Sequence, residues 1–189
     1  MKPFPVIIAG PSGVGKSTII RSIITEIPEL KPFKTITTRP RRSNQEDRYS
    51  FINVDQFQGL IEKGELIEWA EVHGNFYGGL KKDVLEILNL GKFPIPINAV
   101  DVQGVKTYRQ AFPNLLSIFI SYGSLDELPD RIRATRPDAT EEDIRTRMIS
   151  AQKEMEAAKD FDFVVANPEG QLKQTLAKVR DIIKKRIRG

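Results

Sequence analysis

The 189-residue chain carries a formal net charge of +4, with 40% hydrophobic and 29% charged residues, a balance typical of one globular domain. It contains no cysteine and one histidine, His73, which excludes disulfides, cysteine metal sites and histidine-rich metal sites. Apolar runs are too short to span a membrane, and little chain precedes the first predicted strand, so we expect a cytoplasmic protein without a signal sequence or membrane partner.

A phosphate-binding motif lies near the start of the chain. The apolar run 6–9 predicts a buried strand, and isoleucines spaced over 17–27 predict a helix with one buried face. Between them, Gly-Pro-Ser-Gly-Val-Gly-Lys-Ser at 10–17 fits the pattern G-x-x-x-x-G-K-[ST]. Its glycines permit backbone angles that let successive N–H groups cradle a polyphosphate. The helix beginning at Lys16 adds its positive N-terminal end.

This motif predicts a nucleotide-phosphate site with defined roles. Lys16 can reach the β- and γ-phosphates, and the Ser17 hydroxyl can ligate Mg²⁺. We therefore predict that one continuous stretch binds the phosphoryl donor: Gly10, Pro11, Ser12, Gly13, Val14, Gly15, Lys16, Ser17 and Thr18.

The next part of the chain predicts several short strands. We expect strands over 35–38, 49–52 and 66–72, and helices over 56–63 and 82–90. Pro40 ends the first of these strands, Asp55 is the expected N-cap of the first helix, and Gly64 is its expected C′ residue. Because strands cluster here, we predict a small β-rich lobe.

Strands and helices alternate in the second half. We expect helices over 102–112, 141–159 and 169–188, and strands over 95–100, 115–120 and 163–165. Pro94 and Pro96 lack N–H groups on one side of their strand, so regular pairing is expected to begin near Ile97. Capping boxes predict helix starts at Ser124 and Thr140. The alternation predicts an α/β fold with a parallel sheet core flanked by helices.

Three further strings carry a resemblance to a known family. They are Thr-Thr-Arg-Pro-Arg-Arg at 37–42, Glu-Trp-Ala-Glu-Val-His-Gly-Asn-Phe-Tyr-Gly at 68–78 and Asp-Val-Gln-Gly at 101–104. With the phosphate loop, they make the chain resemble the guanylate kinase family almost from end to end. The resemblance implies transfer of the γ-phosphoryl group from Mg·ATP to GMP. It also implies a core of 1–33, 92–124 and 148–189, a GMP-binding lobe of 34–91 and a helical lid of 125–147.

The resemblance also implies residue roles. It places the residues that hold the GMP phosphate at Arg39, Arg42, Tyr49 and Tyr77. It places those near guanine at Thr35, Glu68 and Asp101, with Glu68 accepting from N1 and N2. It places lid arginines at Arg136 and Arg147, and Asn167 near adenine. The implied catalytic set is Lys16, Arg39, Arg136 and Arg147.

Elementary chemistry agrees with these roles. Guanine presents adjacent N–H donors at N1 and N2, for which the carboxylate of Glu68 is a natural acceptor pair. A base without those donors leaves a carboxylate unpaired, which gives selectivity. Guanidinium groups such as Arg39 suit phosphate oxygens.

The chain departs from the family pattern at a few positions. Ala99 stands where the family usually has an acidic residue linked to Mg²⁺ and the phosphate loop. Gly79 replaces a usual hydroxyl residue, which removes one nucleotide contact. One extra lid residue leaves open whether Arg131 or Arg133 takes a further lid role.

Simpler interpretations stand beside several of these roles. We expect Arg41 to face solvent, Trp69 to lie in the core and His73 to be a turn residue, while Asp101 could be a plain helix cap. The basic tail 184–188 lacks aromatic interleaving and is expected to be a solvated helix face, without a nucleic-acid partner.

Two alternative functions remain at this stage. One is a related kinase acting on another small phosphorylated acceptor, and the other is a weakly active or non-catalytic binding module. The expected ligands are ATP and GMP, with dGMP possible, and the expected state is a monomer or homodimer.

Overall fold

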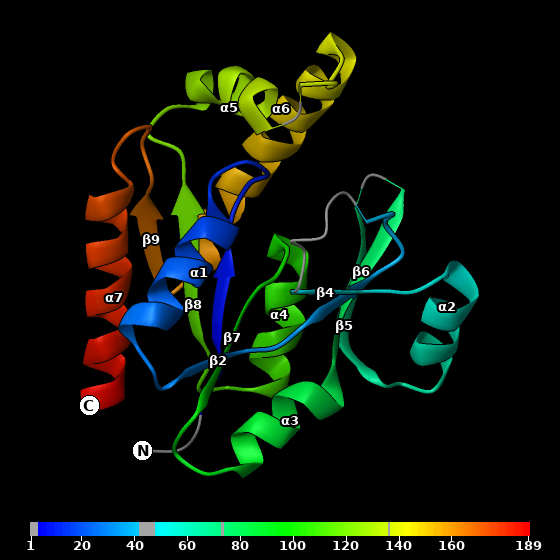
Figure 1. Cartoon of the computed structure of the whole chain (residues 1–189), viewed down its shortest axis with the longest axis vertical. Helices are drawn as coiled ribbons and strands as arrows, with labels where there is room; N and C mark the ends of the chain where they lie inside the picture. The colour runs from blue at the N-terminus through cyan, green and yellow to red at the C-terminus, as the bar shows by residue number, and fades with distance from the viewer. Residues whose placement is uncertain (1–3, 42–47, 73, 136) are drawn as a thin grey trace. The chain divides into compact units, whose positions relative to one another are not determined.

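The structure is a computed structural model that describes residues 4–41, 48–72, 74–135 and 137–189 (Figure 1). Its helices are α1 (Lys16–Glu26), α2 (Val54–Glu62), α3 (Lys81–Asn89), α4 (Val102–Ala111), α5 (Leu128–Thr135), α6 (Glu141–Glu156) and α7 (Leu172–Arg188), with 3₁₀ turns η1 (Leu125–Glu127) and η2 (Ala157–Asp160). Its strands are β1 (Val6–Ala9), β2 (Leu30–Pro32), β3 (Thr35–Thr37), β4 (Tyr49–Phe51), β5 (Leu66–Val72), β6 (Asn75–Leu80), β7 (Ile95–Ala99), β8 (Leu116–Ser121) and β9 (Phe163–Ala166). The predictions for Arg42, His73 and Arg136 lie outside the described residues.

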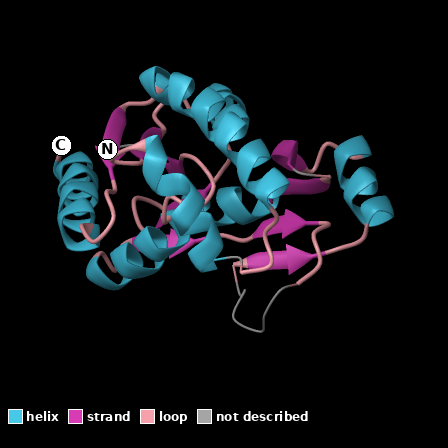
Figure 2. Cartoon of the chain, turned by 90° about the horizontal axis from the view of Figure 1, so that it is seen from above, coloured by secondary structure: helices cyan, strands magenta, loops and turns pink. Residues whose placement is uncertain are grey.

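The strands form two sheets. One has the order β2-β7-β1-β8-β9, and the other has the order β4-β3-β6-β5. The β2–β7 and β8–β9 pairs are parallel, while β6 runs antiparallel to both β3 and β5. Both helices and strands occur throughout the chain (Figure 2). The predicted α/β class with a parallel core sheet is confirmed.

The chain divides into two compact units, and the first comprises residues 1–6 and 28–115. It contains the whole second sheet, with α2, α3 and α4. A small apolar core on one side of that sheet joins Ile36, Phe57 and Leu66. Because α2 supplies Phe57, the amphipathic helix is fixed to the sheet through this cluster.

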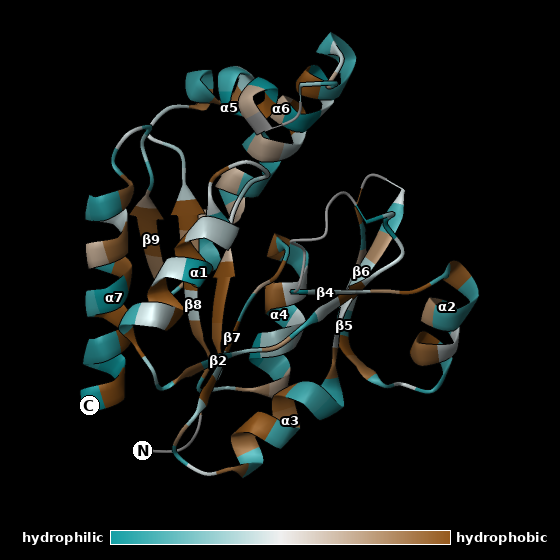
Figure 3. Cartoon of the chain, in the orientation of Figure 1, coloured by the Kyte–Doolittle hydropathy of each residue, from teal (hydrophilic) through white to brown (hydrophobic). Residues whose placement is uncertain are grey.

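The second unit comprises residues 7–27 and 116–189. Its strands β1, β8 and β9 are largely hydrophobic (Figure 3). Helix α1 buries Ile19, Ile20 and Ile23, as its spacing predicts, and it packs against α7. Arg180 on α7 also pairs with Glu26 at the end of α1, at 3.2 Å. This packing fixes the helix that begins at the phosphate loop.

Some local predictions are wrong for identifiable reasons. Asn53, not Asp55, caps α2, because its side chain accepts from the N–H of Gln56 while the Gln56 side chain accepts from the N–H of Asn53. Regular pairing of β7 begins at Ile95, not Ile97, since Ile95 donates its N–H to Glu29. Pro96, which has no N–H, does not interrupt the β2–β7 pairing. Strand β2, which ends at Pro32, is not among the predicted strands.

The predicted helix starts have mixed outcomes. Thr140 and Asp143 form the full capping box at the start of α6, as predicted. Ser124 caps a helical segment as predicted, by accepting from the N–H of Asp126, but this segment begins as the 3₁₀ turn η1 and becomes α-helical only at Leu128.

Candidate functional site

The phosphate loop connects β1 to α1 in the second unit. Gly10, Gly13 and Gly15 all have positive φ, as expected for a loop that turns its N–H groups inward. Gly15 is the left-handed N-cap of α1, with φ 96°, and a Cβ there would lie 2.8 Å from the Asn167 amide nitrogen. Conformation and space therefore both require glycine where the helix begins.

Lys16 and Ser17 occupy the first turn of α1. The Lys16 ammonium donates to the carbonyl oxygens of Gly10 and Pro11, the second at 2.8 Å. The lysine side chain thus lies along the mouth of the loop, in the place where the motif requires a cation. Ser17 is partly buried in the first turn of α1, so its hydroxyl lies at the positive end of the helix dipole.

Asn167 contacts the phosphate loop directly. Its side-chain amide donates to the carbonyl of Val14 at 2.8 Å, and its backbone N–H donates to Ser121 at 2.8 Å. The side chain is 6% exposed. It therefore ties the loop to the end of β8, a structural role that sequence reasoning did not predict.

Two arginines predicted from the lid lie close to the loop or its supports. Arg147 on α6 donates to the Ser12 hydroxyl at 3.3 Å. Arg131 on α5 donates to the carbonyl of Asn167 at 2.8 Å, and its guanidinium lies 5.6 Å from the Tyr122 ring centre. The Tyr122 hydroxyl in turn donates to the Ser12 carbonyl. These contacts gather basic groups around the donor-phosphate loop.

Arg133 is placed differently from Arg131. Its side chain is 48% exposed and pairs with Asp130 at 3.2 Å and Glu141 at 2.9 Å. Both partners are exposed carboxylates on the surface of α5 and α6. Of the two candidates left open by the sequence, Arg131 therefore has the contacts to the loop region.

The second sheet gathers the predicted acceptor residues on one face. Thr35 pairs with Tyr49 on β4 and with Gly79 on β6, and Gly79 pairs with Glu68 on β5. Residues paired across strands share a face, so these positions form one row. A register shift between Leu66 and Glu68 brings Glu68, rather than its neighbour Ile67, into this row.

A basic and aromatic cluster continues the same face. The Arg39 guanidinium lies 5.3 Å from the Tyr49 ring centre and 5.5 Å from that of Phe51, and the residue is 6% exposed. Tyr77 meets Tyr49 edge to face at 6.4 Å. The sheet thus presents a buried guanidinium beside two phenol rings, a set of donors suited to a phosphate.

The neighbouring arginines take different roles. Arg48, which is not among the predicted site residues, donates to the Tyr49 hydroxyl at 2.6 Å and lies 4.6 Å from its ring centre. Its position directly before an implied ligand was the only signal in the sequence. Arg41 is exposed, as predicted, and covers the Phe51 ring at 4.6 Å.

Glu68 is the buried carboxylate of the row. It is 8% exposed, and its pKa is raised to about 8, first by burial and second by the nearby Asp101 carboxylate, while the N–H of Gly79 lowers it by hydrogen bonding. A Cβ on Gly79 would lie 3.2 Å from Glu68 Oε1, and one on Gly104 would lie 2.9 Å from Oε2. Backbone therefore encloses both carboxylate oxygens.

Two other predicted residues have local partners. Asp101 caps α4, because its Oδ1 accepts from the N–H groups of Gln103 and Gly104 at 2.7 and 2.9 Å. The predicted helix cap is thus present, and it also places a charge near Glu68, while the role of Asp101 toward guanine stays a prediction. Thr35 accepts from the Asn98 amide at 2.9 Å, which leaves its own hydroxyl proton available to donate.

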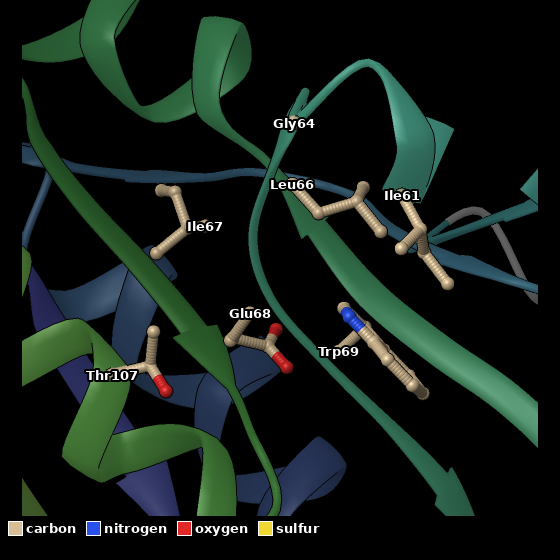
Figure 4. Close-up of a pocket in the computed structure, with 7 residues that line it drawn as sticks. All are labelled: Ile61, Gly64, Leu66, Ile67, Glu68, Trp69 and Thr107. Atoms are coloured by element: carbon tan, nitrogen blue, oxygen red, sulfur yellow. The ribbon is translucent and has the colours of Figure 1, made fainter. Parts of the chain in front are cut away.

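A hollow of about 230 Å³ adjoins Glu68 beside strand β5 (Figure 4). It is lined by Ile61, Gly64, Leu66, Ile67, Glu68, Trp69 and Thr107. Trp69 is 48% exposed and meets Phe76 edge to face, so its predicted core position is wrong. It pairs with Gly78, the neighbour of Gly79, and therefore lies on the opposite face of the sheet from Glu68.

Within the described residues, no three His, Cys, Asp or Glu side chains gather as a metal-binding group. Ala99 at the end of β7 supplies no ligand, and its N–H donates to the Asn98 side chain at 2.8 Å. The helices in the described part of the chain are also too short or too polar to cross a bilayer.

Comparisons with known proteins identify the family of this chain. The sequence model of the family described as guanylate kinase matches residues 2–186. A guanylate kinase of Nostoc sp. strain PCC 7120 is 39% identical over 166 residues, 87% of this chain and 82% of the relative. One of Bdellovibrio bacteriovorus is 38% identical over 169 residues, 88% of this chain and 90% of the relative.

The fold is also known. The crystal structure of a guanylate kinase from Anaplasma phagocytophilum has a TM-score of 0.74 over 97% of this chain and 86% of its own, at 23% identity. That identity supports the fold alone, while the family model and the relatives support kinship. The chain belongs to the guanylate kinase family and is thereby a nucleoside monophosphate kinase.

Proposed function

We propose that this protein transfers the γ-phosphoryl group of ATP to GMP, giving ADP and GDP. The observation that carries the proposal is Glu68, a buried carboxylate in a row of polar positions on the second sheet. A carboxylate that accepts two adjacent N–H donors selects guanine over adenine, and leaving it unpaired penalises other bases. The family supplies the reaction class.

The donor side of the proposal rests on the phosphate loop. Lys16 and the loop N–H groups hold the β- and γ-phosphates, and the Ser17 hydroxyl would be a ligand of Mg²⁺ that accompanies ATP. The metal, when bound, neutralises phosphate charge. With Ala99 in place of a carboxylate, the chain's own contribution to that metal is smaller.

The acceptor side uses the basic and aromatic face. Arg39, Tyr49 and Tyr77 hold the GMP phosphate together with Arg42, and Arg48 orients Tyr49. These groups position an oxygen that is already ionised, so the reaction requires no strong general base.

Lid arginines complete the charge neutralisation. Arg147 lies against Ser12 of the loop, and Arg136 is the second lid arginine that the family pattern predicts. The contacts of Arg131 favour it over Arg133 as a further member. The roles of Thr35, Asp101 and Asn167 toward nucleotides, the lobe and lid boundaries, use of dGMP, cytoplasmic location and oligomeric state stay predictions.

The test is ADP release with Mg·ATP against GMP, dGMP, AMP, CMP, UMP and ribose 1,5-bisphosphate. We expect turnover with GMP and dGMP and at least a hundredfold loss for Lys16→Ala. Lys81→Ala, which removes an exposed lysine that donates to the Gly64 carbonyl, is the matched control and should retain activity. Turnover with a different acceptor, or none by folded protein, would refute the proposal.

A further inference from the structure

Tyr108 has a buried hydroxyl that no described residue satisfies. Its side chain on α4 is 0% exposed, and its ring lies 6.2 Å from that of Phe33 and 6.3 Å from that of Phe112. Among the described residues, no hydrogen-bond partner reaches its Oη. A buried polar group without a partner lowers stability, so its presence calls for a reason outside folding.

The Tyr108 hydroxyl occupies the place of a side chain that Gly79 lacks. A Cβ on Gly79 would lie 2.3 Å from Tyr108 Oη. Thr35 and Glu68 flank Gly79 on the neighbouring strands, with all three on one face. The hydroxyl therefore stands in the middle of the row, between a threonine and the buried carboxylate.

The surroundings keep this hydroxyl protonated. Burial raises the pKa of Tyr108 well above its usual value of 10, and the carboxylates of Glu68 and Asp83 raise it in the same direction. At neutral pH the group is an O–H donor, and the adjacent Glu68, once ionised, supplies acceptor oxygens. A donor and an acceptor thus lie side by side in one row.

We propose that Tyr108 is a specificity-determining residue whose Oη donates a hydrogen bond to O6 of guanine. The guanine edge presents the O6 acceptor directly beside the N1 and N2 donors, which matches a hydroxyl beside the Glu68 carboxylate. Adenine reverses this pattern at both of the adjacent positions, with a donor at C6 and an acceptor at N1. The inference rests on the proposed function and adds a residue from α4 to the recognition of the base.

Tyr108→Phe is the direct test. We expect the KM for GMP to rise about tenfold while the KM for ATP stays within twofold, because one hydrogen bond to the base is lost. We also expect preference for GMP over 6-thio-GMP to shrink several-fold, since a thiocarbonyl sulfur is a weak acceptor. The variant should melt no lower than wild type, because it removes an unsatisfied buried hydroxyl.

A second variant moves the hydroxyl from position 108 to position 79. In Tyr108→Phe, a Cβ on Gly79 would face the ring carbon Cζ at 3.5 Å, an ordinary contact, and Glu68 Oε1 at 3.2 Å. Gly79→Ser combined with Tyr108→Phe should therefore restore the KM for GMP to within about threefold of wild type. Gly79→Ser alone should weaken GMP binding, because its Cβ meets Oη at 2.3 Å.

The outcomes separate this inference from the proposed function. If wild type phosphorylates GMP while Tyr108→Phe keeps both its KM and its preference over 6-thio-GMP, only the inference is refuted. A higher KM with unchanged preference also refutes it, because that pattern indicates a structural role. Equal KM values of the wild-type protein for GMP and 6-thio-GMP would refute the inference without any variant. Wild type inactive on GMP refutes both proposals.

Discussion

The side-chain amide of Asn167 donates a 2.8 Å hydrogen bond to the carbonyl oxygen of Val14. This bond joins the segment after β9 to the centre of the phosphate loop. Asn167→Ala should raise the KM for ATP about fivefold and lower the free energy of unfolding by about 1 kcal/mol. Asn167→Asp should raise the KM for ATP and lower the free energy of unfolding by more than Asn167→Ala does, because a carboxylate would face the Val14 carbonyl oxygen.

The control for this pair is Asn53→Ala, which removes the N-cap of α2. It should cost about 1 kcal/mol of stability as well, with no change in the KM for ATP. Steady-state kinetics and urea unfolding of the three variants make the comparison. Equal ATP kinetics in Asn167→Ala and wild type would exclude the role assigned to this bond.

The binding of GMP should depend on pH through Glu68. Its pKa of about 8 leaves the free carboxyl mostly protonated at pH 7, whereas N1–H and N2–H of guanine prefer the ionised form. Affinity should therefore rise several-fold between pH 7 and pH 8.5 and then level. This range lies above the titration of a phosphate monoester, near pH 6.

Titration calorimetry across this range measures the effect. Glu68→Gln should bind GMP more weakly at every pH and show a flat profile. A rise of the same size in the Glu68→Gln protein would assign the pH dependence to another group.

The same carboxyl predicts a pH dependence of stability without nucleotide. The pKa of Glu68 rises from 4.5 to about 8 on folding, so its protonation favours the folded state. This contribution is complete below pH 4.5 and is lost as the pH rises through 8. Thermal melting at pH 6.5 and 8.5 should show a larger decrease for wild type than for Glu68→Gln, and equal decreases would contradict the assignment.

Arg147 and Arg133, both in the predicted lid, should differ in their effect on kcat. Arg147 contacts the Ser12 hydroxyl of the loop, whereas Arg133 pairs with exposed carboxylates. Arg147→Ala should lower kcat roughly a hundredfold, because it removes charge near the transferred group. Arg133→Ala should stay within about twofold of wild type, since exposed ion pairs contribute little. Comparable kcat losses would refute this distinction.

Local chemistry made much of the fold predictable. The phosphate loop was predictable because its four fixed residues lie between an apolar strand and a helix with periodic isoleucines. Strand β2 was not predictable, because its three residues, the last of them Pro32, carry no pattern and are held by pairing with β7. Asn53 and Asp55 are both good caps, and only the bond to Gln56 decides between them.

The acceptor face was predictable in its residues but not in its arrangement. The family strings indicated Glu68, while the register shift that turns it into the row with Gly79 is a property of sheet pairing. Trp69 then takes the opposite face and is exposed, contrary to the prediction from its hydrophobicity. Nothing in the sequence indicated a role for Tyr108 in the site, because a tyrosine in an amphipathic helix is usually a core residue.

The glycines around Glu68 limit which substitutions this protein can tolerate. Gly79 and Gly104 each leave no room for a Cβ beside one oxygen of the carboxylate. Main chain has no rotamers, so the shape of this recess stays constant while surrounding side chains fluctuate or mutate. In a saturation library, we therefore expect tolerance at exposed positions of β5 and near-complete intolerance at Gly104. Under the proposed function, main-chain positions rather than side chains would therefore fix the shape of the recess that selects the base.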